Sequence, residues 1–265
     1  MGTHESQRLR HPIVIRHLNV LRVERLTLHM QRIVFGGSEL DGFISSAPDD
    51  HVKLFFPNSM GELVLPKMGP DGPIYPSDRE PSPMRDYTPR KYDAERGELT
   101  IDFVLHGDGP ASIWAAQASV GQTLVVAGPR GSFIVADDFD HYVLIGDETA
   151  LPAMGRWLEV MPATATVTLL AEIPDRADRQ SLRSNAQFEV QWLERQGADA
   201  ASSNLLETAL RRLPTPAGDT FYWIATESQR ARQLRQYLSE ERGIPKDWLK
   251  AKGYWQRDGG EPESE

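Results

Sequence analysis

The 265-residue chain contains no cysteine. This absence excludes disulfide bonds, thiolate zinc sites, cysteine-ligated iron–sulfur clusters and thiol nucleophiles. The chain also lacks any run of about 18 apolar residues, the length that a membrane-spanning helix requires. Its first residues do not contain the apolar core of a signal peptide. We therefore expect a soluble cytoplasmic protein.

Positive charge is scarce: 29 Lys and Arg face 38 Asp and Glu, which gives a net charge of −9. Neither half forms a basic surface, which argues against nucleic-acid binding. No histidine follows His141, so the second half cannot supply a histidine metal site. With 40% hydrophobic and 25% charged residues the composition is that of an ordinary globular protein. The length fits one large domain or two small ones.

Short apolar or alternating segments fill the first half of the chain, with glycine and proline clusters between them. They are residues 31–35, 51–56, 62–65, 100–105 and 123–126. Such segments with regular turn signals predict an antiparallel β-barrel or sandwich. One helix is predicted here, at residues 111–119, because it follows Gly109-Pro110.

The second half has a different pattern, in which strands alternate with helices. Strands are predicted at 142–145, 166–171, 188–192 and 221–225, and helices at 150–161, 205–213 and from about 227 to 243. Thr226 and Gln229 have the spacing of a capping box at the start of the last helix. Strand, helix and strand in series predict a parallel sheet with helical crossovers. We therefore expect a β-barrel domain in 1–139, an α/β domain in 140–257 and an acidic disordered tail in 258–265.

The segment 84–92 carries the clearest candidate site. On an extended strand Arg85, Tyr87 and Pro89 face one way, whereas Asp86, Thr88 and Arg90 face the other. An arginine and an aromatic ring on one face suit a planar cofactor that bears phosphate. The alternative is a solvated turn between strands with Tyr87 half-buried.

Arg85-x-Tyr87-Thr88-x-Arg90 resembles the flavin signature of ferredoxin-reductase-like flavoproteins, and in this form that of the siderophore-interacting protein family. Further matches follow in order at residues 50–57, 102–115, 128–132, 146–153 and 252–255. The likeness runs from about His17 to Trp255. It implies an N-terminal antiparallel β-barrel that binds FAD, followed by a parallel-sheet α/β domain of the NAD(P)H-binding kind.

The resemblance implies that three segments hold the FAD. Arg85, Tyr87 and Thr88, with Asp86 among them, would contact the phosphate, one ring face and the ring N5 edge. Asp102, Phe103, Val104 and His106 would form a strand beside the ring. Gly109, Ala111 and Ser112 belong to the glycine-rich turn 107–112, which enters a helix and whose backbone N–H groups suit a pyrophosphate. An ordinary helix start would explain this turn equally well.

The turn 146–150 joins a strand to a helix, the usual place for a nucleotide in an α/β domain. It is not a conventional glycine fingerprint, and Asp147 or Thr149 acting as a helix cap is an alternative. The resemblance places Thr149, like Thr88, near the reacting rings as a catalytic residue. Arg176, Arg179 and Arg232 are candidates for the NADPH phosphate, or simply solvated charges.

Lys53 and Arg130 are cations in apolar or tight local contexts of an acidic protein. Many ferric chelates are anions, so a basic pocket would attract them. The resemblance implies that basic residues near the flavin receive the chelate; a surface or sheet-edge charge is the alternative for both. Tyr254 and Trp255 would cover the flavin or the adenine, unless they pack in the core.

The activity that the resemblance implies is an FAD-dependent ferric-siderophore reductase, which passes electrons from NADPH or NADH to Fe(III) chelates and releases Fe(II) for iron uptake. Flavin links the two-electron hydride donor to the one-electron acceptor. Hard oxygen ligands bind Fe(II) less tightly than Fe(III), so no protein metal ligand is required. The alternatives are a related flavin reductase, for instance one served by ferredoxin, and a non-catalytic ferric-siderophore-binding protein. We expect a monomer.

Overall fold

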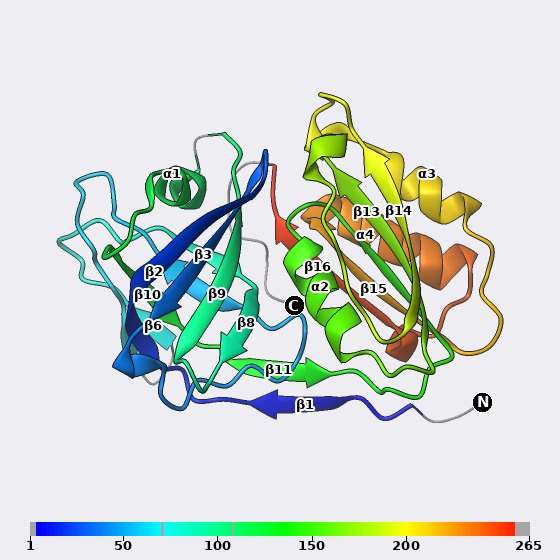
Figure 1. Ribbon diagram of the computed structural model, residues 1–265, viewed down its shortest axis with the longest axis horizontal. Coiled ribbons are helices and arrows are strands. Elements are labelled where there is room, and N and C mark those ends of the chain that lie inside the picture. Colours follow the sequence, from blue (N-terminus) through cyan, green and yellow to red (C-terminus); the bar gives the residue numbers. More distant parts are fainter. Residues whose placement is uncertain (1–3, 70–71, 108, 258–265) are drawn as a thin grey trace.

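The structure, a computed structural model, describes residues 4–69, 72–107 and 109–257 and has two halves side by side (Figure 1). The predicted acidic tail and Asp108 of the predicted glycine-rich turn lie outside the described residues. Among the residues described, no helix is long and apolar enough to cross a membrane.

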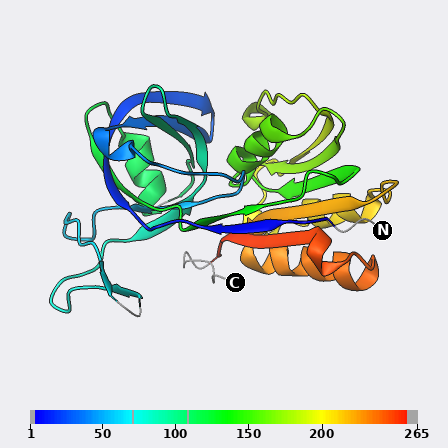
Figure 2. The same cartoon turned by 90° about the horizontal axis from the view of Figure 1, so that it is seen from below.

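The first half is a seven-stranded antiparallel sheet, ordered β7-β4-β10-β2-β3-β9-β8, that curls into an open barrel (Figures 1 and 2). Its strands are β2 (Ile15–Thr27), β3 (Met30–Gly36), β4 (Val52–Phe55), β7 (Met84–Tyr87), β8 (Pro89–Asp93), β9 (Glu98–Val104) and β10 (Thr123–Ala127). Alternate side chains such as Ile33, Phe35 and Leu54 fill the interior, as the period of a strand requires. Helix α1 (Pro110–Gln117) buries Ala111 and Ala115 against this core.

The second half is a five-stranded sheet, ordered β14-β13-β12-β15-β16, in which every pair is parallel. Its strands are β12 (His141–Gly146), β13 (Thr166–Ile173), β14 (Gln187–Glu194), β15 (Thr220–Glu227) and β16 (Leu249–Trp255); its helices are α2 (Leu151–Val160), α3 (Leu205–Arg212) and α4 (Ser228–Gln236). Neighbouring strand residues serve opposite faces: Leu144 packs with α2, and Ile145 packs with α3 and α4. Both faces are therefore covered, as expected of a parallel sheet, and the predicted fold class is confirmed.

A two-stranded strap joins the halves. β1 (Gln7–Arg10) pairs with β11 (Gly131–Ile134), and together they run beneath both halves (Figure 1). Ahead of β1, the His4 ring stacks on Phe139 and bonds to Asp138, just before β12, and to Asp219 of the second half. The predicted domain boundary falls between β11 and β12.

The remaining elements are small. They are β5 (Lys67–Gly69) and β6 (Gly72–Ile74), which form a hairpin, the 3₁₀ turns Ser38–Leu40, Arg176–Asp178, Ala200–Ser202 and Lys246–Trp248, and a π-helical turn, Tyr237–Glu241, after α4.

Three local predictions were wrong or incomplete. Residues 62–65 form no strand, because the Ser82 hydroxyl, rather than a neighbouring strand, accepts the N–H of Val64. Strand β16 was not predicted, because its lysines and glycine interrupt the apolar pattern that indicates a buried strand. The cap of α4 is Glu227, whose carboxylate accepts the N–H groups of Gln229 and Arg230. Thr226 is instead the penultimate residue of β15, and its hydroxyl donates to Asp147.

Candidate functional site

Two of the predicted site residues, Thr88 and Tyr254, meet where β16, the edge strand of the parallel sheet, faces the barrel. A hydrogen bond joins Thr88, between β7 and β8, to the Tyr254 phenol, and burial raises the pKa of that phenol well above its ordinary value. Lys252 Nζ lies 3.1 Å from His51 Nδ1, and Lys250 forms a 2.6 Å ion pair with buried Asp49. The last strand therefore brings three side chains into contact with the barrel.

The aromatic part of the flavin motif is built into the barrel wall. The Tyr87 ring lies 4.6 Å from that of Phe103, which is fully buried. Burial also raises the pKa of Tyr87, so its phenol stays protonated. Because the side chains of Phe103 and Val104 fill hydrophobic cores, only their backbone groups are available to a ligand. Half-buried Arg85 donates to the carbonyl of Met84 at 2.7 Å.

Arg90 links the two halves and lies beside Asp102 in the barrel. The buried Asp102 carboxylate receives two bonds from Arg32, at 2.7 and 2.8 Å, and Arg90 Nε lies 4.0 Å away. Arg90 also donates two hydrogen bonds to the carboxylate of Glu159 in α2. Its guanidinium lies against Gly155, where an added Cβ would be 3.0 Å from Arg90 Nη2. Two guanidiniums thus occupy the carboxylate of Asp102, which was predicted to lie beside the flavin.

Two glycines before α1 have open space around them. Among the described residues, no side chain caps the helix at Gly109, and a Cβ added at Gly107 or Gly109 would meet nothing within 4 Å. Ser112 accepts the N–H of His106 at 2.9 Å, which closes the turn. An uncapped helix start with open space in front of two glycines fits a diphosphate, because N–H groups and helix dipole both favour an anion there.

Around Asp86 the structure gathers a charge cluster. Its carboxylate lies 2.9 Å from Lys53 Nζ and 3.6 Å from His51 Nε2, and Lys252 approaches His51 from the other side. Burial raises the pKa of Asp86, but His51 and the two lysines outweigh it and hold the pKa below its ordinary value. Burial, reinforced by Lys252, lowers the pKa of His51 to about 4. His51 and Lys252 were not predicted; the match at residues 50–57 was the available signal for His51.

Arg130, the other predicted chelate residue, is exposed on the loop before β11. Its carbonyl accepts the N–H of His11 at 2.9 Å. Ala127 of β10 pairs with Lys53 of β4 in the barrel sheet, and Arg130 follows Ala127 by three residues.

The depressed pKa of His51 predicts an acid-sensitive fold. Between pH 6.5, its ordinary pKa, and about 4, the unfolded chain binds a proton that the folded chain does not, so stability falls as pH falls through this window. We expect His51→Gln to flatten that part of the profile. Urea unfolding at several pH values checks this, and parallel curves for the two proteins would show that His51 is not responsible.

Thr149 is held inside the turn between β12 and α2. Asp147 Oδ1 accepts its N–H at 2.9 Å and its hydroxyl at 2.5 Å. The N-cap of α2 is Ala150 and has no side-chain cap, so neither Asp147 nor Thr149 caps that helix.

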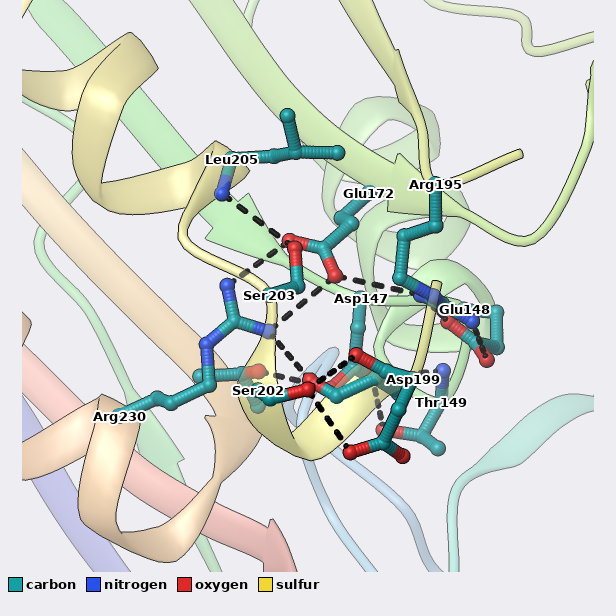
Figure 3. A network of polar contacts seen from close by, with 12 residues as sticks. Asp147, Glu148, Thr149, Glu172, Arg195, Asp199, Ser202, Ser203, Leu205 and Arg230 are labelled. Atoms are coloured by element: carbon teal, nitrogen blue, oxygen red, sulfur yellow. Dashed lines mark hydrogen bonds and ion pairs between the residues drawn. The ribbon is translucent and has the colours of Figure 1, made fainter. Parts of the chain in front are cut away.

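At the carboxyl edge of the sheet lies a buried ion-pair network (Figure 3). Arg195 binds Glu148 at 2.6 Å and Glu172 at 3.3 Å. Arg230 binds Glu172 at 2.8 Å and Glu207 at 2.9 Å. The network was not predicted, although a glutamate inside the apolar end of β13 was a signal of it.

The arginines predicted to bind a nucleotide phosphate lie outside this network. Arg176, Arg179 and Arg232 are exposed, and Arg179 is paired with Glu194 at 2.6 Å.

An open antiparallel barrel followed by a parallel α/β domain defines the ferredoxin-reductase-like class of two-domain proteins. The solved phthalate dioxygenase reductase shares this fold at 12% identity and a TM-score of 0.59, over 91% of this chain and 68% of that one. The family models are specific: "Siderophore-interacting FAD-binding domain" matches residues 19–133, and "Siderophore-interacting protein" matches residues 139–258. The chain belongs to the siderophore-interacting protein family, which confirms the resemblance found in the sequence.

Relatives are similar to this chain over more than nine tenths of its length. The NADPH-dependent ferric-chelate reductase of Escherichia coli is 39% identical over 94% of this chain and 96% of its own. The ferric vibriobactin reductase ViuB of Vibrio cholerae is 34% identical over 91% and 89%. The crystal structure of a siderophore utilization protein from T. fusca has a TM-score of 0.90 and 40% identity, over 98% of this chain and 99% of that one.

Proposed function

We propose that this protein is an FAD-dependent reductase that transfers electrons from NADPH to ferric siderophores. The observation that carries the proposal is the junction itself, where Thr88, the last residue of the Arg85–Thr88 segment of the barrel, is hydrogen-bonded to Tyr254 of β16 in the parallel sheet. The names of the relatives from E. coli and V. cholerae support the same reaction.

In this proposal the barrel binds FAD. Arg85 and the free N–H groups at the start of α1 bind the diphosphate, since both present positive charge. Tyr87, fixed against Phe103, supplies a flat apolar wall, and Thr88 supplies a hydroxyl whose position is set by Tyr254. When bound, FAD supplies the exchange between a two-electron hydride donor and a one-electron acceptor. The protein orients the ring and excludes water from one side of it.

Lys53 and Arg130 receive the chelate, with Lys252 as a further cation of the same region. In a chain of net charge −9, this local concentration of positive charge steers an anionic chelate to one place. Among the residues described, no group of three or more His, Asp or Glu is arranged to hold a metal ion. The proposal therefore keeps the iron in its own chelate as the substrate.

An absorbance spectrum tests the proposal. The purified protein, reconstituted with FAD, should show flavin bands that bleach with NADPH without air and recover when a ferric chelate is added. A protein that takes up no FAD would end the proposal. Bands that bleach with reduced ferredoxin but not with NADPH would replace the donor and leave the reductase assignment intact.

We also propose that the protein works as a monomer in the cytoplasm, where NADPH is available. Sedimentation at micromolar concentration tests the first part, and a sedimentation coefficient that rises with concentration would contradict it.

Replacing Lys53 or Arg130 by methionine should weaken anionic chelates selectively. Each loss should raise the KM for an anionic ferric chelate roughly tenfold, as expected for one partly exposed charge contact, with FAD content unchanged. A neutral hydroxamate chelate is the control substrate. Equal losses for both chelates would contradict the electrostatic role.

A further inference from the structure

Asp147 is a buried carboxylate that the proposed reaction does not use. Its side chain is fully buried. Besides the two bonds from Thr149 to Oδ1, Oδ2 accepts the Thr226 hydroxyl at 2.7 Å and the Trp255 indole N–H at 2.8 Å. All four donors are neutral, and these hydrogen bonds, together with the nearby Arg195 cation, offset the cost of burying this charge.

The three partners of Asp147 come from three elements: the turn before α2, the end of β15 and the end of β16. Two glycines allow this convergence. A Cβ at Gly146 would lie 2.5 Å from both Ala150 Cβ and the Ala225 carbonyl, and one at Gly253 would lie 2.3 Å from Ser228 Oγ. The backbone around Asp147 is therefore packed closely and has little room to move.

Trp255 is anchored but is not used for packing. Its indole N–H binds Asp147, and its carbonyl accepts the Ser228 hydroxyl at 3.1 Å. Among the residues described, its half-buried ring belongs to no hydrophobic cluster and pairs with no other ring. Its neighbour Tyr254, by contrast, packs on Trp223. A rigidly held ring that packs on no other ring and in no cluster of the described residues is suited to a planar ligand.

Trp255 directly follows Tyr254, whose phenol is hydrogen-bonded to Thr88 of the flavin motif. Across the junction, desolvation lowers the pKa of His106 and the charge of Asp147 acts in the opposite direction. The anchored indole therefore stands beside the proposed FAD site.

We infer that Asp147 is a positioning residue, which fixes the Trp255 indole and the Thr149 hydroxyl so that the indole face meets a planar ring of the bound FAD or of its nicotinamide donor. This inference rests on the proposed function. Asp147 itself touches neither ligand; it acts through Trp255.

The donor set explains why an aspartate is required. An indole N–H and a backbone N–H can only donate. Asparagine can accept from one of these two, but its NH₂ group then faces the other. Thr226 is different, because its hydroxyl can rotate and accept instead. Asp147→Asn therefore breaks the hydrogen bond from the Trp255 indole N–H or the one from the Thr149 backbone N–H. Thr226→Val also removes a hydrogen bond to this carboxylate, but it leaves those two hydrogen bonds in place.

The test compares Asp147→Asn, Trp255→Phe, their double variant and the control Thr226→Val. Near-ultraviolet circular dichroism of the cofactor-free proteins reports the tryptophan environment. The fluorescence of bound FAD, before and after NADP⁺ is added, reports ring contact. We expect Asp147→Asn to change the tryptophan signal as Trp255→Phe does, and to raise the KM for NADPH roughly tenfold at full FAD content. The double variant should resemble Trp255→Phe, and Thr226→Val should resemble the unmodified protein.

A change in FAD fluorescence before NADP⁺ is added assigns the indole to the flavin, and a change only afterwards assigns it to the donor. The inference is overturned if Asp147→Asn behaves like Thr226→Val, or if its effect adds fully to that of Trp255→Phe. If Asp147→Asn does not fold, Trp255→Phe carries the test, because it deletes the same bond from the other end; unchanged fluorescence and KM then overturn the inference. If neither the variants nor the unmodified protein bind FAD, the proposed function fails instead. The circular dichroism of the cofactor-free proteins then still shows whether Asp147 holds Trp255.

Discussion

Arg85→Ala should release FAD. The guanidinium is the one charged side chain that the flavin motif directs to the diphosphate, and a charge-assisted contact of this kind contributes about 2–3 kcal/mol. The dissociation constant of FAD should therefore rise roughly 30- to 150-fold. Fluorescence titration of the cofactor-free protein measures it directly.

Two variants make this prediction specific. Arg85→Lys keeps the charge but loses the planar fork, so it should bind FAD with an affinity between those of Arg85→Ala and the unmodified protein. Arg79→Ala, which removes an exposed arginine paired with Glu62, should bind FAD normally. Normal FAD binding by Arg85→Ala would place the diphosphate elsewhere.

Arg230→Met should cause the largest loss of stability. Its guanidinium binds fully buried Glu172 and partly buried Glu207, and it also donates to the carbonyl of Ala200. Removing the cation leaves buried carboxylates with too little positive charge, and such broken buried pairs cost about 3–5 kcal/mol. Urea unfolding of the two proteins at pH 7 checks the value.

The network itself supplies a second test. If uncompensated charge is the cause, Glu172→Gln should recover part of the loss when it is added to Arg230→Met. Arg211→Met, at an exposed pair with Glu241, should change stability little, because solvent screens that pair. A cost below about 1 kcal/mol for Arg230→Met would mean that the network contributes little to folding.

Much of the fold could be predicted from local patterns. Alternating apolar residues in the first half and strand–helix alternation in the second predicted the two sheets. Burial of one or both faces of a sheet determines which positions are apolar over short stretches of the sequence. The misses were also local. Strand β16 is rich in lysine because one of its edges faces charged groups of the barrel, and the capping residue of α4 lies one position after the one predicted.

The candidate site was predicted only in part. The Arg85–Thr88 segment and the turn before α1 could be found because each is continuous in sequence. The partners of these residues could not: Lys252 meets His51 across 201 positions, and Trp255 meets Asp147 across 108. Nothing near His51 or Asp147 in the sequence specifies these contacts.

The sequence by itself determined the two sheets, the flavin motif and the family, since each is written in residues that lie close together along the chain. Only the tertiary structure decided which donors each buried or partly buried carboxylate receives: Arg32 for Asp102, Lys53 for Asp86, and the indole of Trp255 for Asp147. The physical reason is that a buried charge must be matched by whatever group the strand order brings within about 3 Å, and strand order is a property of the assembled sheets.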